Sequence, residues 1–477
     1  MPYRLFLPLL ILAATPALAQ RPDEAAERQR SVEAGLLPAV LVAGAPQPTY
    51  SVTDRMAHYG VPAVSVAVIN DGRIEWARGY GVREAGGSVT TATLFQAASI
   101  SKPITATAAL RLVEAGRLDL DGDVNDRLRS WHVPESAYTA EHPVTLRGLL
   151  SHTAGLTVSG FPGYAAGEAV PTLVGVLDGE GNTDPVRVDT TPGTAARYSG
   201  GGFAVAQLLV EDVTGEPFAA VVGRTVLDPL GMERSTFAQP LPDALGGEAA
   251  VAHDEGGAPV AGRWHTYPER AAAGLWTTPT DLARFLLGLR AAWLGEPGAI
   301  LSPEMTREMF TRGMVSYGLG IGVDNAGDSL RVGHNGANWG YRAVMVLYPA
   351  TGDGAVVMTN ADAGGEIRYE ILRAISQAYG WPDFKPDARE VVTLGGGAAE
   401  RLVGAYRFVE DPARVLVVDF DGDHFTVRHP SEAPQRLWPV SETSFFVEGE
   451  GTSVVFAPGG AEGEMEWNGE ERARRVR

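Results

Sequence analysis

Ser99 and Lys102, three residues apart, are the first candidates for chemistry in this chain. If this stretch is helical, residues at positions i and i+3 share a face, so the lysine amine can reach the serine hydroxyl. A serine hydroxyl is a weak nucleophile, but a neighbouring amine can take its proton when burial lowers the pKa of that amine. Pro103 suits the first turn of a helix, whose N-terminus stabilises negative charge developing nearby. The pair favours acyl transfer, although this spacing alone is also typical of an exposed lysine.

Six further segments follow this pair along the chain. They are Gly116–Asp121, Val144–Leu156, Arg197–Gly200, Pro229–Met232, Ala273–Thr278 and Gly333–Gly336. Together with Phe95–Lys102, and in this order, they resemble the serine β-lactamase and penicillin-binding-protein superfamily, in particular its class C β-lactamase-like branch. That branch includes family VIII carboxylesterases, D-Ala-D-Ala carboxypeptidases and D-aminopeptidases. The resemblance covers residues 50–380 approximately, and several segments in order are more specific than any single one.

The resemblance implies catalytic roles for four side chains. Ser99 would be the acylated nucleophile, Lys102 would hold or accept its proton, and Tyr198 would act as general base through its phenolate. An unperturbed tyrosine titrates near ~10, so nearby cations would have to keep it ionised. His334 would face the leaving group or a substrate carboxylate, and an unperturbed histidine changes charge near ~6.5, so a pH-dependent rate is expected. The backbone N–H groups of Ser99 and Ala337 would form the oxyanion hole.

The resemblance also implies a set of substrate-binding positions. They are Gly200, Asn335, Gly336, Trp339 and Tyr341. Gly200 stands where relatives carry an asparagine that would contact a substrate carbonyl, and His334 stands where many relatives carry a lysine. Both departures argue against an efficient β-lactamase and are compatible with an esterase or a peptidase. Trp339 and Tyr341 fit pocket lining and core packing equally well.

Other conspicuous side chains are interpreted as structural. His152 directly follows Ser151, but adjacent side chains on a helix diverge, so the two are not expected to act as a catalytic dyad. Trp276 and Tyr317 lie in glycine-containing stretches and are expected to pack in the core.

The leading functional hypothesis is an exported serine hydrolase that acts through an acyl-enzyme on small esters or D-amino-acid peptides. A class C-like β-lactamase is the nearest alternative. A penicillin-binding or sensory module that is acylated without turnover is a different class, and so is a catalytically inactive binding protein. The intact Ser99, Lys102 and Tyr198 argue against the inactive version. An α/β-hydrolase is disfavoured because the chain contains no Gly-x-Ser-x-Gly segment.

Charge and composition exclude several other roles. The 39 basic and 58 acidic residues give a formal net charge of −19, which repels phosphate backbones and anionic lipids, so no nucleic-acid partner is expected. The absence of cysteine excludes disulfides, thiolate nucleophiles and cysteine-ligated zinc. No His-Glu-x-x-His segment occurs, and neither a metal site nor a cofactor is expected. The expected partner is a small-molecule ester, peptide or β-lactam substrate, and the sequence carries no signal for an oligomeric state.

The N-terminus has the pattern of a secretory signal peptide. Arg4 supplies the positive start, Leu5–Ala14 is an apolar run, and Ala17-Leu18-Ala19 forms an Ala-x-Ala cleavage site. The run is too short to span a bilayer. We therefore expect residues 1–19 to be removed, the mature protein to be periplasmic or secreted, and no integral membrane segment to remain.

Hydrophobic patterning predicts the elements that must position the candidate residues. Strands are expected at 64–69, 74–77, 330–336, 343–348 and 355–359, and helices at 104–114, 203–214, 280–292 and 366–379. Asp71-Gly72 indicates a hairpin between the first two strands. Strands at both ends with helices between them favour an α+β domain whose sheet joins the two ends. By the resemblance this sheet is antiparallel and flanked by helices, with a helical subdomain.

The expected organisation has five parts. They are the signal peptide at 1–19, an N-terminal lead segment at 20–48, a β-lactamase-like serine hydrolase domain at 49–385, a linker at 386–399 and a small all-β C-terminal domain at 400–477. The linker contains Gly395-Gly396-Gly397, and the short strands after it, with turn signals between them, are typical of an all-β module.

Overall fold

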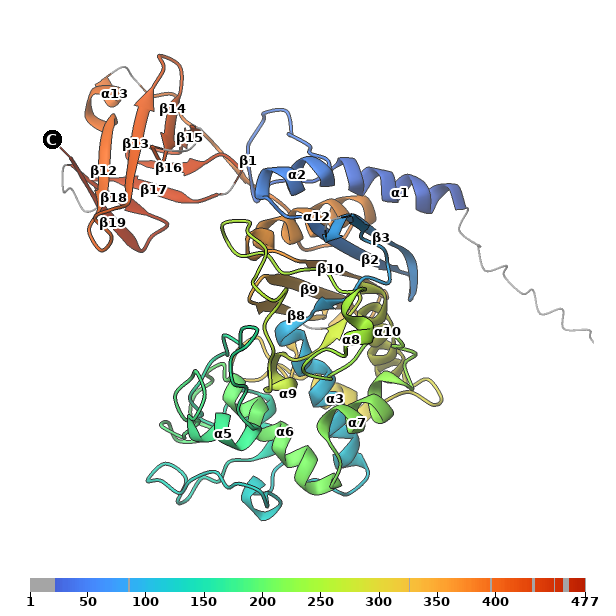
Figure 1. Ribbon diagram of the computed structural model, residues 1–477. Helices are drawn as coiled ribbons and strands as arrows, with labels where there is room; N and C mark the ends of the chain where they lie inside the picture. The colour runs from blue at the N-terminus through green and yellow to red at the C-terminus, as the bar shows by residue number, and fades with distance from the viewer. Residues whose placement is uncertain are drawn as a thin grey trace, which may run out of the picture.

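The computed structural model describes residues 22–84, 86–325, 327–394, 397–430, 434–449, 451–457 and 463–476. The expected signal peptide at residues 1–19 lies outside the described residues, as do Gly395 and Gly396. Within these ranges, no helix combines the length and the apolar character that crossing a bilayer requires. The chain forms a main domain of helices around a sheet, followed by a barrel at its C-terminal end (Figure 1).

A seven-stranded antiparallel sheet joins the two ends of the main domain. Its strands are β2 (Ala63–Asn70), β3 (Arg73–Glu84), β4 (Gly87–Ser88), β7 (Gly322–Asp324), β8 (Arg331–Asn338), β9 (Tyr341–Tyr348) and β10 (Asp353–Thr359), in the order β4-β3-β2-β10-β9-β8-β7. The two halves meet where β2 pairs with β10, with Val66 opposite Val357. The predicted α+β architecture is therefore confirmed, because strands from both ends of the chain complete one sheet.

The first hairpin shows why these residues form strands. β2 is predominantly apolar and is buried along seven of its eight positions, as expected for a central strand covered on both faces. Asp71 and Gly72 connect it to β3 with φ angles of 50° and 71°, which is the left-handed conformation that a tight hairpin turn requires. The predicted strand–turn–strand is confirmed.

Helices cover both faces of the sheet (Figure 1). α1 (Pro22–Ala34), α2 (Val52–Tyr59) and α12 (Gly365–Tyr379) pack on one face, and α10 (Pro279–Leu294) packs on the other. The first face shares a hydrophobic cluster that includes Val66 and Ile371, whereas the second shares a larger cluster that includes Ala67 and Leu286. Because side chains alternate along a strand, the consecutive residues Val66 and Ala67 contribute to different cores.

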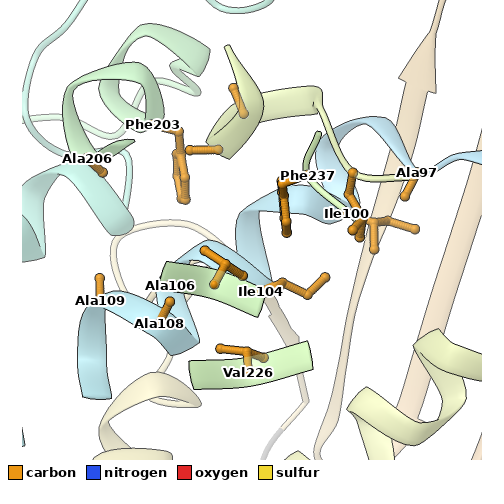
Figure 2. Packing of buried hydrophobic residues seen from close by; sticks show 14 of the residues in the cluster. Ala97, Ile100, Ile104, Ala106, Ala108, Ala109, Phe203, Ala206, Val226 and Phe237 are labelled. Atoms are coloured by element: carbon orange, nitrogen blue, oxygen red, sulfur yellow. The ribbon is translucent and has the colours of Figure 1, made fainter. Parts of the chain in front are cut away.

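Helix α3 (Ser101–Glu114) runs through the centre of the helical part of the domain. All ten residues from 101 to 110 are buried, so this helix has no solvent-facing side along its first part. Figure 2 shows Ile104 and Ala108 of this helix packed among Phe203, Val226 and Phe237. The predicted helix at 104–114 is confirmed, and it begins three residues earlier at Ser101.

The remaining elements of the main domain are short, apart from α6. They are β5 (Phe95–Gln96), the 3₁₀ turn η1 (Ala98–Ile100), η2 (Val124–Asp126), α4 (Leu146–Leu150), α5 (Leu173–Asp178), α6 (Gly200–Thr214), α7 (Phe218–Val222), η3 (Gly223–Leu227), α8 (Asp243–Gly246), α9 (Arg270–Ala273), β6 (Trp276–Thr277), α11 (Pro303–Met309), η4 (Gly327–Ser329) and η5 (Asp362–Gly364).

The N-terminal lead segment packs on the main domain. Arg28 of α1 forms an ion pair with Glu75 of β3, with a nitrogen–oxygen distance of 2.6 Å. Beyond α1, the short strand β1 (Val40–Val42) pairs in parallel with β11 (Asp387–Arg389), which lies within the expected linker. The segments that precede and follow the main domain are therefore hydrogen-bonded to each other.

Eight strands at the C-terminal end close into a barrel. They are β12 (Gly404–Phe408), β13 (Val415–Phe420), β14 (Phe425–Arg428), β15 (Gln435–Pro439), β16 (Ser444–Val447), β17 (Ser453–Phe456), β18 (Glu464–Trp467) and β19 (Glu471–Arg475), preceded by α13 (Gly397–Leu402). Its interior is filled by a hydrophobic cluster of its own that includes Phe425, Phe445 and Phe456. The predicted all-β C-terminal domain is confirmed, and closure leaves no unpaired edge.

Removal of the barrel should leave the main domain folded, because their hydrophobic clusters are separate. A chain that ends at Thr393 loses few described contacts, among them the hydrogen bond from Ala39 to Gly449 and the stacking of Arg389 on Phe446. We expect the melting temperature of the main domain to fall by less than about 5 °C, which corresponds to about 1–2 kcal/mol in a domain of this size. Calorimetry of both chains checks this. Loss of a cooperative transition in the shorter chain would show that the barrel is part of the main fold.

Candidate active site

The turn that leads into α3 brings Ser99 and Lys102 together. Ser99 lies in η1, and the preceding Ala98 has a φ of 51°, an unfavourable conformation for a residue other than glycine. Lys102 lies in the first turn of α3, and its Nζ is 2.9 Å from Oγ of Ser99. The same Nζ donates a hydrogen bond of 2.9 Å to the carbonyl oxygen of Ala272 in α9. The proximity expected from the spacing in the sequence is therefore present.

Lys102 is buried without a carboxylate partner. Its side chain is 2% exposed, and among the described residues no Asp or Glu oxygen lies within 4.0 Å of its Nζ. Burial disfavours the charged ammonium and lowers the pKa of Lys102 to about 7. A substantial fraction of the amine is thus neutral at neutral pH, and its lone pair can accept the hydroxyl proton of Ser99.

Tyr198 lies beside this pair, in the loop before α6. Its hydroxyl hydrogen-bonds with Ser99, and the Nζ of Lys102 lies 4.9 Å from its ring centroid. Although the residue is 39% exposed, burial around the hydroxyl raises the pKa of Tyr198 to about 12, and the hydrogen bond with Ser99 offsets this only in part. The expected phenolate is therefore not the favoured form at neutral pH, because burial disfavours the charged oxygen.

His152 forms the back of the Tyr198 site. Its ring lies 4.3 Å from that of Tyr198 and 4.7 Å from that of Tyr317, between centroids. His152 has a φ of 61°, and its Nδ1 accepts a hydrogen bond of 3.1 Å from the backbone N–H of Ser199. Burial first, and then the charge on Lys102, hold the pKa of His152 well below its usual range. His152 supports the loop that carries Tyr198 and does not contact Ser99.

His334 faces the same cavity from β8 but is not free to titrate near neutral pH. Its Nε2 lies 2.9 Å from the hydroxyl of Tyr317, and its Nδ1 lies 2.6 Å from the carbonyl oxygen of Asn335. Burial and the charge on Lys102 lower the pKa of His334 to about 3. The expectation that His334 changes charge near pH 6.5 is therefore wrong, because the site gives the imidazolium no anionic partner.

Tyr317 was not identified as a site residue from the sequence. It was expected to pack in the core, and it is indeed buried, but its hydroxyl reaches His334 across the cavity. Its place in a loop between α11 and β7 gives no periodic signal. Only the contact with His334, 17 positions away in the sequence, identifies it.

The edge of β8 is open beside Ser99. Val323 of β7 donates its N–H to a loop carbonyl, away from β8. Since backbone groups alternate along an antiparallel strand, the neighbouring Gly322, opposite Gly333, is the residue turned towards β8. The same alternation directs the N–H groups of Asn335 and Ala337 to this side of β8. These residues lie beyond Gly333, the last partner of β7, so β7 does not cover them. The expected position of the Ala337 N–H is consistent with this geometry.

Gly336 lets β8 approach the serine-bearing turn. A Cβ atom on this residue would lie 2.2 Å from the carbonyl oxygen of Ala97, directly before η1. Any side chain at this position would therefore separate β8 from Ser99. Gly336 contributes to the site by the absence of a side chain.

A cavity of about 500 Å³ opens in front of these groups. Its lining includes Ser99, Tyr198, Tyr317, His334 and Ala337. Among the described residues, no group of three or more His, Asp or Glu side chains could hold a metal ion. The arrangement combines a serine hydroxyl, an amine with a pKa of about 7 and the backbone N–H groups of a strand edge, which fits the chemistry of acyl transfer.

Three expected substrate-binding residues lie elsewhere than predicted. Tyr341 is fully buried and donates a hydrogen bond of 2.6 Å to the carbonyl oxygen of Ala250, so the pocket-lining interpretation is wrong. Gly200 is buried behind Phe161 and does not line the cavity, because a Cβ atom there would already lie 3.0 Å from that ring. Trp339 is 48% exposed and lines a neighbouring hollow that shares only Ala337 with the cavity.

Comparison with known proteins supports the assignment of the fold. The family described as Beta-lactamase matches residues 51–379. The chain belongs to the beta-lactamase family. Curated members of similar sequence include penicillin-binding protein 4 of Amycolatopsis lactamdurans, which is 28% identical over 343 residues, spanning 67% of this chain and 86% of that protein. Esterase EstB of Burkholderia gladioli is 35% identical over 212 residues, which span 42% of this chain and 52% of that protein.

Solved structures share the fold of this family member. The octameric penicillin-binding protein homologue from Pyrococcus abyssi has a TM-score of 0.62 and 22% identity, covering 88% of this chain and 98% of that one. The D-amino acid amidase from Ochrobactrum anthropi has a TM-score of 0.56 and 23% identity, covering 74% and 99%. At these identities the likeness shows the fold alone. Of the similar proteins named here, one is an esterase and one is a D-amino acid amidase.

Gly336→Ala should disrupt the site through packing alone. The added methyl group meets a backbone oxygen that cannot move without shifting η1, so we expect a loss of about 1–3 kcal/mol in stability. A displacement of Ser99 by about 1 Å should lower the hydrolysis of a short acyl ester by about 100-fold. Thermal melting and ester turnover are the measurements. Gly365→Ala, at a helical position with open space around it, is the matched control and should retain both. Normal activity in Gly336→Ala would contradict the proposed close approach.

Proposed function

We propose that this protein is a serine hydrolase that forms an acyl-enzyme on Ser99 and acts on small esters or on D-amino-acid amides and peptides. The observation that carries the proposal is the buried amine of Lys102, which lies 2.9 Å from Oγ of Ser99 and has a pKa of about 7. A neutral amine in this position is a competent general base, because it needs no prior deprotonation by another group.

In the proposed acylation step, Oγ of Ser99 attacks the substrate carbonyl carbon while its proton passes to Nζ of Lys102. The carbonyl oxygen becomes an oxyanion, which the N–H groups of Ser99 and Ala337 stabilise. Collapse of this intermediate breaks the bond to the leaving group. The hydroxyl of Tyr198 donates its proton to the departing atom and regains one from the Lys102 ammonium. Water then repeats the sequence on the acyl-enzyme and releases the acid.

The pKa directions favour Lys102 over Tyr198 as the base. The pKa of Tyr198 is raised to about 12, so its hydroxyl is protonated at neutral pH, whereas the pKa of Lys102 is lowered to about 7. We therefore propose that Lys102 is the general base and that Tyr198 relays protons as a neutral hydroxyl, not as a phenolate. Its hydrogen bond with Ser99 supports this role.

The charges around the cavity favour neutral substrates over β-lactams that carry a carboxylate. His334 is neutral where many relatives have a lysine. Arg331 is paired with Asp324 and Asp383, and Arg368 donates to the carbonyl oxygens of Gly336 and Ala343. β-Lactam hydrolysis is the second candidate, and the family match together with the penicillin-binding relative favours it.

The signal-like segment at 1–19 supports a location outside the cytoplasm, so we propose that the protein acts as an exported enzyme.

Ser99→Ala should abolish turnover, because no other side chain is proposed as nucleophile. We expect less than about one thousandth of the wild-type rate on a short acyl ester, and no covalent adduct by intact-mass spectrometry. Ser101→Ala is the matched control, since the buried hydroxyl of Ser101 accepts a hydrogen bond from the N–H of Leu275 and has no access to substrate. An adduct on Ser101, or substantial turnover without Ser99, would contradict the proposal.

Intact-mass spectrometry together with turnover measurements distinguishes the esterase or amidase from the β-lactamase and from the penicillin-binding module. A panel of short acyl esters, D-amino-acid amides, D-Ala-D-Ala peptides and cephalosporins is compared on the wild-type chain. We expect esters to be turned over faster than cephalosporins. Faster turnover of cephalosporins would favour the β-lactamase, whereas a stable adduct without turnover would favour a penicillin-binding or sensory module.

The rate should fall as the pH drops through about 7. Protonation of Lys102 removes the lone pair that accepts the Ser99 proton, so kcat/KM for a neutral ester should decrease about tenfold per pH unit below the pKa of Lys102. Stopped assays between pH 5 and 9 measure this acidic limb. His334→Gln is the control: because His334 is neutral throughout this range, the limb should keep its midpoint. A limb that disappears in His334→Gln would assign it to His334 instead.

A further inference from the structure

We propose that Tyr317 is a positioning residue that locks His334 in its neutral Nδ1–H form, so that protons at Ser99 move only through Lys102 and Tyr198. The inference rests on the proposed hydrolase function and adds a residue to it that none of the matched segments contains. Its basis is a chain of two hydrogen bonds that links Tyr317, His334 and the backbone of Asn335.

The direction of both hydrogen bonds follows from one carbonyl group. The carbonyl oxygen of Asn335, 2.6 Å from Nδ1 of His334, can only accept, so Nδ1 must carry a hydrogen. A neutral imidazole has a single N–H, which leaves Nε2 with a lone pair. The hydroxyl of Tyr317, 2.9 Å from Nε2, must then donate its proton to that lone pair.

Protonation of His334 would break this arrangement. An imidazolium donates from both nitrogens, so Nε2 would present a hydrogen to the hydroxyl of Tyr317. That hydroxyl would have to turn its own hydrogen elsewhere, and it is buried with His334 as its one hydrogen-bond partner among the described residues. The cost of leaving it unpaired adds to the cost of a buried charge.

The groups that surround His334 supply no compensating negative charge. Lys102 of α3 repels an added positive charge, while Tyr198 before α6 and His152 after α4 are neutral. From the sheet side, Asp324 lines the same cavity but is paired with Arg331. Arg368 of α12 is a second cation there. The hydrogen bond to the Asn335 carbonyl raises the pKa of His334, but burial and the charge on Lys102 outweigh it, so the surroundings favour the neutral form that the Tyr317 hydroxyl stabilises.

The hydrogen bond from Tyr317 to His334 has a direct consequence for catalysis. With its Nε2 lone pair occupied, His334 can neither take the Ser99 proton nor deliver one to a leaving group. Removal of the Tyr317 hydroxyl would open Nε2 to the cavity and create a second titratable base beside the substrate. Tyr317 thus leaves Lys102 and Tyr198 as the groups that transfer protons at Ser99, and it acts through His334.

The test measures the tautomer and the titration of the His334 imidazole directly. Uniformly ¹⁵N-histidine-labelled protein is titrated by NMR between pH 5 and 8 without substrate, and the His334 signal is assigned by its loss in His334→Gln. We expect wild-type His334 to be the Nδ1–H tautomer with no titration in this range. Wild-type His334 as the Nε2–H tautomer, or titrating between pH 5 and 8, would overturn the proposal without any variant.

Tyr317→Phe then removes only the hydroxyl. We expect the pKa of His334 to rise from about 3 to at least about 5, so that it enters the titrated range, and the kcat/KM profile to gain a second ionisation that His334→Gln in the same background removes. Tyr406→Phe is the matched control, because its buried hydroxyl also donates one hydrogen bond, to the carbonyl oxygen of Leu402 in the barrel, far from the cavity. A folded Tyr317→Phe with an unchanged tautomer and titration would overturn the proposal.

The two proposals fail in different ways. If Ser99 is not the nucleophile, the NMR result still stands, since it requires no turnover. If Tyr317 does not hold His334, ester hydrolysis through Ser99 continues but the tautomer or its titration differs. Should Tyr317→Phe not fold, the wild-type tautomer and titration decide the question.

Discussion

The burial of the Lys102 amine is the constraint on which the site depends. Its Nζ lies 2.9 Å from the Ser99 hydroxyl and from the carbonyl oxygen of Ala272, with no described carboxylate beside it. Transfer of an unpaired ammonium from water into a protein interior costs several kcal/mol, so folding favours the neutral amine. The apolar packing of α3, which is buried on every side along its first three turns, supplies the free energy that keeps Lys102 there. The core of the domain and its proton acceptor are thus parts of one packing arrangement.

Close approach of backbones completes the site around this amine. η1 presents Ser99, the loop before α6 presents Tyr198, and the open edge of β8 presents the N–H of Ala337. Gly336 is the point where the sheet meets the helical part, because only a residue without a side chain fits against the carbonyl of Ala97. The sheet and the helices therefore cannot shift independently without moving the nucleophile relative to its backbone donors.

Tyr198, His334 and His152 are kept neutral by the same physical cause. Burial raises the pKa of Tyr198 to about 12 and lowers that of His334 to about 3, while the charge on Lys102 adds to the effect on both His334 and His152. Of Lys102, Tyr198, His152 and His334, only Lys102 has a pKa near neutrality. Lys102 is therefore the proton acceptor among these four groups at physiological pH, which is consistent with a hydrolase of neutral esters or amides.

Much of this protein could be read from its sequence, because the relevant signals are local. The Ser99–Lys102 spacing, the Asp71-Gly72 turn, the periodicity of the long helices and the short strands after Gly397 depend on neighbouring residues. The order of the matched segments placed Tyr198 and His334 in one site. Tertiary structure alone decided which way side chains point and what surrounds them. Tyr341 turned into the core, Phe161 covered Gly200, and Tyr317 reached His334 from a loop without a pattern. The pKa of each group was likewise decided by burial and by charges from distant segments, which sequence spacing does not encode.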